Sequence, residues 1–67
     1  MKYIINGVEK PYIQQNIHQL LQSHGIDPEK QGIAVAVNGE VIARSMWRNY
    51  VIKPGDRVDI VTAVAGG

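Results

Sequence analysis

The 67-residue sequence contains no cysteine. Disulfide bonds, iron–sulfur clusters and thiol nucleophiles are therefore excluded from this chain, and any such chemistry would belong to a partner. Long hydrophobic runs are also missing, since no segment approaches the roughly 20 apolar residues of a membrane-spanning helix. The start, MKYIING, is far short of a signal-peptide core of roughly 7 to 15 apolar residues, which predicts a cytoplasmic protein.

An excess of charge of one sign is missing as well. Seven Lys and Arg residues stand against six Asp and Glu, for a net charge of +1, so charge gives no reason to expect a nucleic acid or membrane partner. Hydrophobic residues at 45% and charged residues at 19% are typical of a folded globular chain. Because so short a chain has little core to divide, we expect one domain over residues 1–67, with a flexible Gly-Gly tail at 65–67.

An Asn-Gly pair near the start predicts a tight β-hairpin, because both positions of such a turn need positive φ. Asn6 and Gly7 lie between apolar stretches, which predicts strands over residues 2–6 and 8–12. Pro11 lacks a backbone donor and should place the second strand at a sheet edge.

The next segment has the periodicity of a helix, with apolar residues recurring at one face: Ile13, Ile17, Leu20 and Leu21. Asn16 followed by Gln19 resembles a capping box, and Gly25 is suited to the residue after a helix end. These signals predict a short helix over residues 17–24 with one buried side.

A second hairpin and a last strand follow the helix. Asn38-Gly39 joins IAVAV to EVIAR, and Pro54-Gly55 precedes the strand RVDIVTAV. The order of two strands, a helix, two strands and a final strand predicts an α+β fold, with the helix packed on one face of a sheet.

Residues for catalysis or metal binding are not arranged for either task. His18 and His24 would lie about 240° apart around a helix and could not share a metal ion. Ser23 and Ser45 lie outside any G-x-S-x-G turn, and no two carboxylates are placed as an acid–base pair. We therefore expect a protein that is not an enzyme, without a bound metal or cofactor.

Two other features have a structural and a functional interpretation. A basic cluster interleaved with acidic residues is more typical of a solvated face than of a nucleic acid footprint; it comprises Arg44, Arg48, Lys53 and Arg57, with Asp56 and Asp59. Trp47 is interpreted as a packing anchor, helped by Tyr50, rather than a ligand-stacking residue.

The C-terminal stretch TAVAGG points more directly to a function. Gly66 and Gly67 have no Cβ, so the end can extend along a narrow channel and bring the Gly67 carboxylate close to a partner's reactive groups, with Ala65 entering behind them. The alternative interpretation is a frayed terminus.

Three stretches together resemble the sulfur carrier proteins of thiamine biosynthesis, the ThiS family: YIING, GIAVAVNGEVIARSMW and KPGDRVDIVTAVAGG. The likeness covers nearly the whole chain, and its last fifteen residues are the most specific part. It implies the ubiquitin-like β-grasp fold, a mixed sheet of about five strands in which the last strand is central and parallel to the first. Ala43 departs from the family pattern, since related sequences often have Pro there, and we expect this to affect only loop stiffness.

The resemblance also implies a carrier cycle at Gly67. A ubiquitin-activating-type adenylyltransferase, ThiF-like, would use ATP to convert the Gly67 carboxylate to an acyl adenylate. Sulfur from another protein's persulfide would then displace AMP, and the resulting thiocarboxylate would supply a thiazole synthase, ThiG-like, with sulfur for the thiazole ring. ATP is thus used by the partner, and the carrier itself binds no cofactor.

Strand alternation predicts which side chains face the helix and which face outward. The inward set is Tyr3, Ile5, Val58 and Ile60; the outward set is Ile4, Arg57, Asp59, Val61 and Ala63. We expect Ile4, Val61 and Ala63 to form a small exposed apolar patch beside the tail, where partners dock.

Other functions remain open from the sequence. The small subunit of molybdopterin synthase and ubiquitin-like modifiers share a Gly-Gly end, so sequence features elsewhere must distinguish them. A binding module of the TGS type has a similar turn before its last strand but does not usually stop at Gly-Gly. Ferredoxin-type relatives of the fold are excluded by the lack of cysteine.

Overall fold

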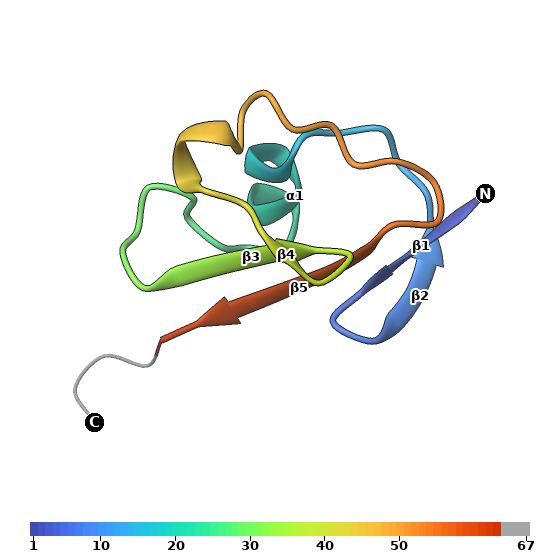
Figure 1. Ribbon diagram of the computed structural model, residues 1–67, viewed down its shortest axis with the longest axis horizontal. Helices are drawn as coiled ribbons and strands as arrows, with labels where there is room; N and C mark the ends of the chain where they lie inside the picture. The colour runs from blue at the N-terminus through green and yellow to red at the C-terminus, as the bar shows by residue number, and fades with distance from the viewer. Residues whose placement is uncertain (64–67) are drawn as a thin grey trace.

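The computed structural model describes residues 1–63, which form a mixed five-stranded sheet with an α-helix on one face (Figure 1). The strand order is β2-β1-β5-β3-β4, with bounds β1 Lys2–Ile5, β2 Val8–Pro11, β3 Ile33–Val37, β4 Glu40–Val41 and β5 Arg57–Thr62. The last strand lies at the centre, parallel to β1 and antiparallel to β3. The predicted β-grasp topology is therefore confirmed.

Both Asn-Gly pairs form the predicted hairpin turns. Asn6 and Gly7 have φ of 50° and 80°, and Asn38 and Gly39 have φ of 52° and 83°. β1 ends at Ile5 rather than residue 6, because Asn6 takes the first left-handed position of the turn. β2 is an edge strand, as its proline predicted.

The helix α1 spans Ile17–Ser23 and begins with the predicted capping box. Asn16 Oδ1 accepts the N–H of Gln19 at 2.8 Å, and Gln19 Oε1 accepts the N–H of Asn16 at 3.0 Å. The helix begins at Ile17, as predicted, so Ile13 lies four residues before it. The prediction that Ile13 belongs to the buried stripe is therefore wrong, and Ile13 is 61% exposed.

The core lies between α1 and the inner face of the sheet. Ile17, Leu20 and Leu21 of the helix are fully buried, and each contributes about 1.5 to 3 kcal/mol by leaving water. The segment between β4 and β5, which includes the 3₁₀ helix η1 Arg44–Met46, adds Trp47 and Ile52. Trp47 is 2% exposed and its Nε1–H donates to the carbonyl of Ile42 at 3.0 Å, which confirms its role as a packing anchor.

The asparagines of the two turns also hold β5. Asn6 Oδ1 accepts the N–H of Ile60 at 2.6 Å, and Asn38 Oδ1 accepts the N–H of Arg57 at 3.0 Å. Asn38 Nδ2 donates in addition to Asp56 Oδ1 at 3.0 Å. Turn residues needed for their backbone angles therefore also fix the first part of β5, which runs on along the sheet toward the C-terminal end (Figure 1).

Candidate functional site

The residues predicted to carry the chemistry, Gly67 with Gly66 and Ala65, lie outside the described residues. The described chain ends at Ala63, directly after β5. The N–H of Ala63 donates to the carbonyl of Gly32 at 2.7 Å. The loop before β3 therefore holds the point from which the last four residues continue.

The predicted assignment of strand faces is confirmed. Tyr3, Ile5, Val58 and Ile60 are all buried against the core, whereas Val61 is 62% exposed on the opposite face. Alternation along β5 is thus preserved up to the end of the strand.

Small apolar side chains lie on the outer face of the sheet next to Val61, with Asp59 on the same face as the partner of Ala36. Ala34 pairs with Val61, and Ala36 pairs with Val41, which is 72% exposed on β4. Paired residues of antiparallel strands share a face, so these four side chains line one surface, here called the outer-sheet patch: Ala34, Ala36, Val41 and Val61. Sequence reasoning missed the alanines and Val41; the alternation in IAVAV was the signal, but the pairing with β5 was needed to interpret it.

Ile4 does not join this patch. It is half-buried and pairs with Arg57, and Val61 lies four residue steps, about 13 Å, after Arg57 along β5. The ion pair between Arg57 Nε and Asp59 Oδ2, at 3.8 Å, lies between the two positions. The expectation that Ile4, Val61 and Ala63 form one patch is corrected, because the parallel register places Ile4 at the start of β5.

A hollow of about 320 Å³ opens where β5 ends. The loop between α1 and β3 forms one wall and β5 the other; the lining residues are Gly25, Ile26, Asp27, Lys30, Gln31, Ile33, Thr62 and Ala63. No sequence motif marked this hollow, because its walls come from segments distant in the chain. It places apolar and charged groups beside the exit of the tail.

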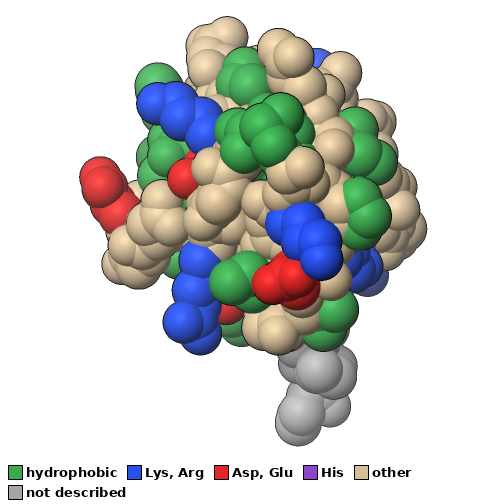
Figure 2. Space-filling view, turned by 90° about the vertical axis from the view of Figure 1, so that its right-hand side faces the viewer, with side chains coloured by type: hydrophobic (Ala, Val, Ile, Leu, Met, Phe, Trp, Pro, Cys, Tyr) green, Lys and Arg blue, Asp and Glu red, His purple; other side chains and the backbone are tan. Residues whose placement is uncertain are grey.

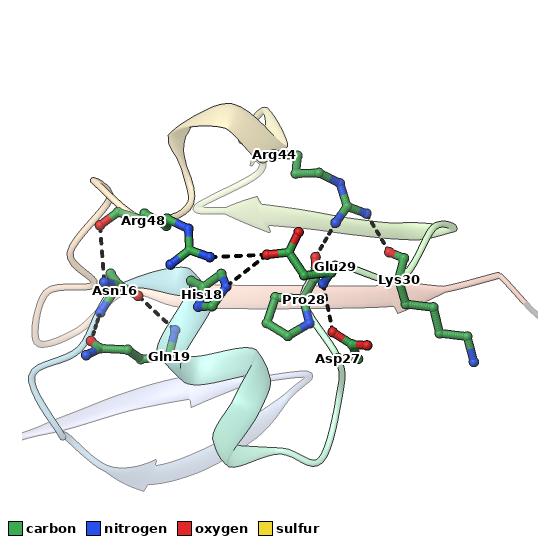
Figure 3. A network of polar contacts seen from close by, with 9 residues as sticks. All are labelled: Asn16, His18, Gln19, Asp27, Pro28, Glu29, Lys30, Arg44 and Arg48. Carbon is green, nitrogen blue, oxygen red and sulfur yellow. Dashed lines mark hydrogen bonds and ion pairs between the residues drawn. The ribbon is translucent and has the colours of Figure 1, made fainter.

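Polar contacts fix the loop that forms this wall (Figure 3). Asp27 Oδ1 accepts the N–H of Glu29 at 2.9 Å, and the Glu29 carboxylate accepts Arg48 Nη2–H at 3.2 Å. The His18 ring reaches the same carboxylate, with Nε2 3.4 Å from Oε1. The loop is thus tied both to α1 and to the segment after η1.

Arg44 makes the second set of contacts to this loop. Its guanidinium donates to the carbonyl of Pro28 and, at 2.6 Å, to that of Lys30 (Figure 3). The central carbon of this guanidinium, Cζ, lies 4.6 Å from the ring centroid of Trp47, in cation–π contact. A residue that the sequence placed in a solvated basic cluster therefore joins the loop to the core.

The other candidate residues are not brought together. His18 faces Glu29, whereas His24 Nε2 lies 3.4 Å from Lys10 Nζ. Within residues 1–63 no group of three or more potential metal ligands is found. On the face that Figure 2 shows, basic and acidic side chains are interspersed with hydrophobic ones.

Among residues 1–63, no helix has the length and hydropathy needed to cross a lipid bilayer.

The chain is similar to a known protein family, to individual curated proteins and to solved structures. The model of the ThiS family matches residues 4–67, which is most of the chain and includes its Gly-Gly end. The chain belongs to the ThiS family. This membership favours the resemblance seen in the sequence over the molybdopterin synthase and TGS alternatives.

Two curated proteins, one a separate carrier and one a larger enzyme, contain a sequence similar to this chain. The sulfur carrier protein ThiS of Escherichia coli K12 is 30% identical over 53 residues, covering 79% of this chain and 77% of that protein. A thiazole synthase of Paramagnetospirillum magneticum is 32% identical over 68 residues, covering all of this chain but only 20% of that protein. A ThiS-like sequence is therefore found alone in one case and within a thiazole synthase in the other.

Solved ThiS structures agree with the fold. The crystal structure of the thiamine biosynthesis protein ThiS from Geobacter metallireducens matches with a TM-score of 0.80 and 26% identity, covering all of both chains. The solution structure of a thiamine biosynthesis protein from that organism matches with a TM-score of 0.75 and 26% identity, covering all of this chain and 88% of the other. The β-grasp fold described above is thus the fold of the solved ThiS structures.

Proposed function

We propose that this chain is a sulfur carrier of thiamine biosynthesis that holds sulfur as a thiocarboxylate at Gly67. The observation that carries the proposal is the family match, which continues through residue 67 and so includes the Gly-Gly end. In this role the chain is a co-substrate of its partner enzymes. It supplies a reactive carboxylate and a docking surface, and no catalytic side chain of its own.

The chemistry begins with activation of the carboxylate. A carboxylate oxygen of Gly67 attacks the α-phosphorus of ATP in the partner's active site, and pyrophosphate leaves. The terminal sulfur of a protein persulfide then attacks the acyl carbon and AMP leaves. A thiol finally cleaves the sulfur–sulfur bond, which leaves the thiocarboxylate on Gly67 and a disulfide on the donor side.

The length of the tail limits the geometry of this reaction. Four residues follow Ala63, and four extended residues span at most about 14 Å. The activating enzyme must therefore bring ATP within that distance of Ala63. Gly66, and Ala65 before it, are narrow enough to enter a channel of this depth.

Two partners follow from the proposal: a ThiF-like adenylyltransferase and a ThiG-like thiazole synthase. The P. magneticum thiazole synthase supports the second, because a ThiS-like region within that polypeptide is expected if the two proteins act together. We assign docking to the outer-sheet patch, whose Val61 and Ala34 lie at the tail end of β5, and to Ala63 directly after the strand. Ile4 belongs to a separate part of the surface and would contact only a larger partner.

The proposal is tested by intact mass spectrometry of the chain after incubation with its activating enzyme, ATP and a persulfide donor with a thiol reductant. One carboxyl oxygen should be replaced by sulfur, with a matching increase in mass. Absence of that increase, with an activating enzyme shown to be competent, would contradict the proposal.

Length variants of the tail provide the control. Removing Gly67, or adding one residue after it, displaces the reactive end by about 3.5 Å, well beyond the roughly 1 Å that already costs a hundredfold. ATP–pyrophosphate exchange should be lost, while stability changes by less than about 0.5 kcal/mol. Exchange at the normal rate in either variant would identify the tail as a frayed terminus.

A further inference from the structure

The hollow at the end of β5 lies on the opposite side of the strand from the outer-sheet patch. Side chains alternate along β5, so Thr62, which lines the hollow, points away from the face of Val61. Ile33 pairs with Thr62 and lines the hollow with it. The chain therefore reaches Ala63 with the outer-sheet patch on one side and the hollow on the other.

The hollow has the size and the lining of a site for a side chain. Its volume of about 320 Å³ is at the lower end of the roughly 300 to 1,000 Å³ of pockets that bind small molecules. Ile26 and Ile33, its apolar lining, are half-buried and pack against the core. The loop that forms its wall is held by Arg44 and, through Glu29, by Arg48. This preformed surface can receive an aliphatic side chain of a partner at little cost in ordering.

Of the two charged side chains that line the hollow, only Asp27 is engaged in the loop itself. Its Oδ1 accepts the N–H of Glu29 at 2.9 Å. Lys30 Nζ makes no ion pair within residues 1–63, and its side chain extends away from the polar network (Figure 3). The Lys30 carbonyl, in contrast, is held by Arg44. The hollow therefore offers an unpaired cation, which is complementary to a carboxylate.

The length of the tail brings a partner to both surfaces. Four residues follow Ala63, so the Gly67 carboxylate lies at most about 14 Å from it. A channel that holds this carboxylate at its inner end has its mouth near Ala63. Because the mouth surrounds the chain, its rim meets the outer-sheet patch on one side and the hollow on the other.

We propose that the hollow is a second docking site, which the ThiF-like activating enzyme fills with an aliphatic side chain next to a carboxylate that pairs with Lys30. This inference rests on the proposed function. A separate activating enzyme is met by diffusion, and an unpaired charge beside an interface speeds that encounter. A thiazole synthase that contains a ThiS-like region in its own polypeptide, as the P. magneticum relative does, has less need of such steering.

Charge reversal tests the ionic contact, with Lys30→Glu compared with Lys53→Glu. Lys53 is exposed before the opposite end of β5 and also makes no ion pair within the described residues. Both variants change the net charge equally, so they share any effect of overall charge. Calorimetry with the cognate activating enzyme should show that Lys30→Glu binds on the order of tenfold more weakly than Lys53→Glu. At saturating carrier, kcat of ATP–pyrophosphate exchange should be equal for the two, because only docking has changed.

Filling the hollow tests the apolar contact. Thr62→Phe places a ring where the partner's side chain would enter, and Val8→Phe adds the same ring to an exposed residue of the edge strand β2. Aromatic residues suit strands, so both variants should keep nearly the original melting temperature. Affinity for the activating enzyme should fall on the order of tenfold for Thr62→Phe and stay unchanged for Val8→Phe. If circular dichroism shows that Thr62→Phe does not fold, the smaller Thr62→Leu takes its place.

The outcomes separate this inference from the proposed function. Absence of a thiocarboxylate on the unchanged chain overturns the proposed function. If that chain is converted, equal affinities in the lysine pair overturn the ionic contact, and equal affinities in the phenylalanine pair overturn the apolar contact. Weaker binding to the thiazole synthase alone, with the activating enzyme bound normally, overturns the choice of partner. A lower kcat at unchanged affinity overturns the docking role, since it places the effect on the chemical step.

Discussion

The first part of β5, residues 57–60, and its second part, residues 61 and 62, differ in how the rest of the molecule holds them. In the first part, Val58 is fully buried, and the N–H groups of Arg57 and Ile60 donate to side chains of the two turn asparagines. In the second part, Val61 is 62% exposed on the outer face, and Ala63, directly after the strand, donates its N–H to the carbonyl of Gly32. One strand therefore passes from the core to the surface within six residues.

This difference separates stability from function along a single strand. Burial of Val58 and Ile60 gives the first part most of its contribution to the free energy of folding, and the two hydrogen bonds to the asparagines add to it. The second part buries little, so its side chains are free to meet a partner and its changes should cost little stability. Substitutions in the two parts should accordingly affect different measurements.

The largest expected effect on stability is that of Val58→Ala. Removing two buried methyl groups and leaving a cavity should lower the free energy of unfolding by about 2 kcal/mol. Val61→Ala, the same change in the exposed part, should lower it by less than about 0.5 kcal/mol. Urea denaturation of both variants measures the difference, and equal losses would show that the two parts are held alike.

Val61→Asp should produce the largest effect on binding. A charge in the outer-sheet patch must be desolvated when a partner docks, so affinity for the activating enzyme should fall by about tenfold or more, with little change in melting temperature. Val8→Asp is the matched control, because Val8 is 55% exposed on the edge strand β2. Similar affinity losses for both variants, measured by calorimetry, would argue against docking at the patch.

Asn6→Gly should have a smaller effect, confined to stability. Glycine keeps the positive φ of the turn but removes the hydrogen bond to the N–H of Ile60, which should cost about 1 kcal/mol. Asn6→Ala should cost more, because alanine adds backbone strain to the same loss. Thermal unfolding ranks the variants, and a glycine variant as stable as the original would show that this bond contributes nothing to holding β5.

The smallest effect is expected from Ala43→Pro, outside β5. Ala43 has φ of −60° and ψ of 142°, which proline adopts, and its N–H donates to no acceptor in residues 1–63. Proline should raise the free energy of unfolding by about 0.4 to 1 kcal/mol by restricting the unfolded chain. Ala36→Pro, within the β3–β5 ladder, should lower it instead. Thiocarboxylate formation by Ala43→Pro should be unchanged; a change would mean that stability and function are not separable as β5 suggests.

Several local features of the fold were predictable from the sequence. The Asn-Gly turns, the Asn16 capping box and the edge position of Pro11 each depend on a few neighbouring residues, whose backbone preferences act within one turn of chain. The strand faces were predictable for the same reason, because alternation needs only the direction of one residue. The central, parallel position of the last strand came from the family resemblance and not from such local signals.

The errors occurred where a local pattern met a competing constraint. Ile13 had the spacing of a helix face, but the cap at Asn16 starts the helix later. Ile4 had the correct face but the wrong neighbours, because its parallel partner is Arg57 rather than Val61. For Ile4 the period was correct about direction and silent about position along the strand, whereas for Ile13 a helical period was extended to a residue that lies before the helix.

The sequence by itself determined the turns, the helix cap, the inward and outward faces and the presence of a Gly-Gly end, because each depends on the chemistry of adjacent residues. Only the tertiary structure decided which side chains lie next to Val61, that Arg44 holds the α1–β3 loop, and that Gly32 lies against Ala63. Those contacts join segments far apart in the chain, and they depend on the register of β3 with β5. Register is set by the whole packed core, since the burial of one sheet face allows only one alignment of the strands.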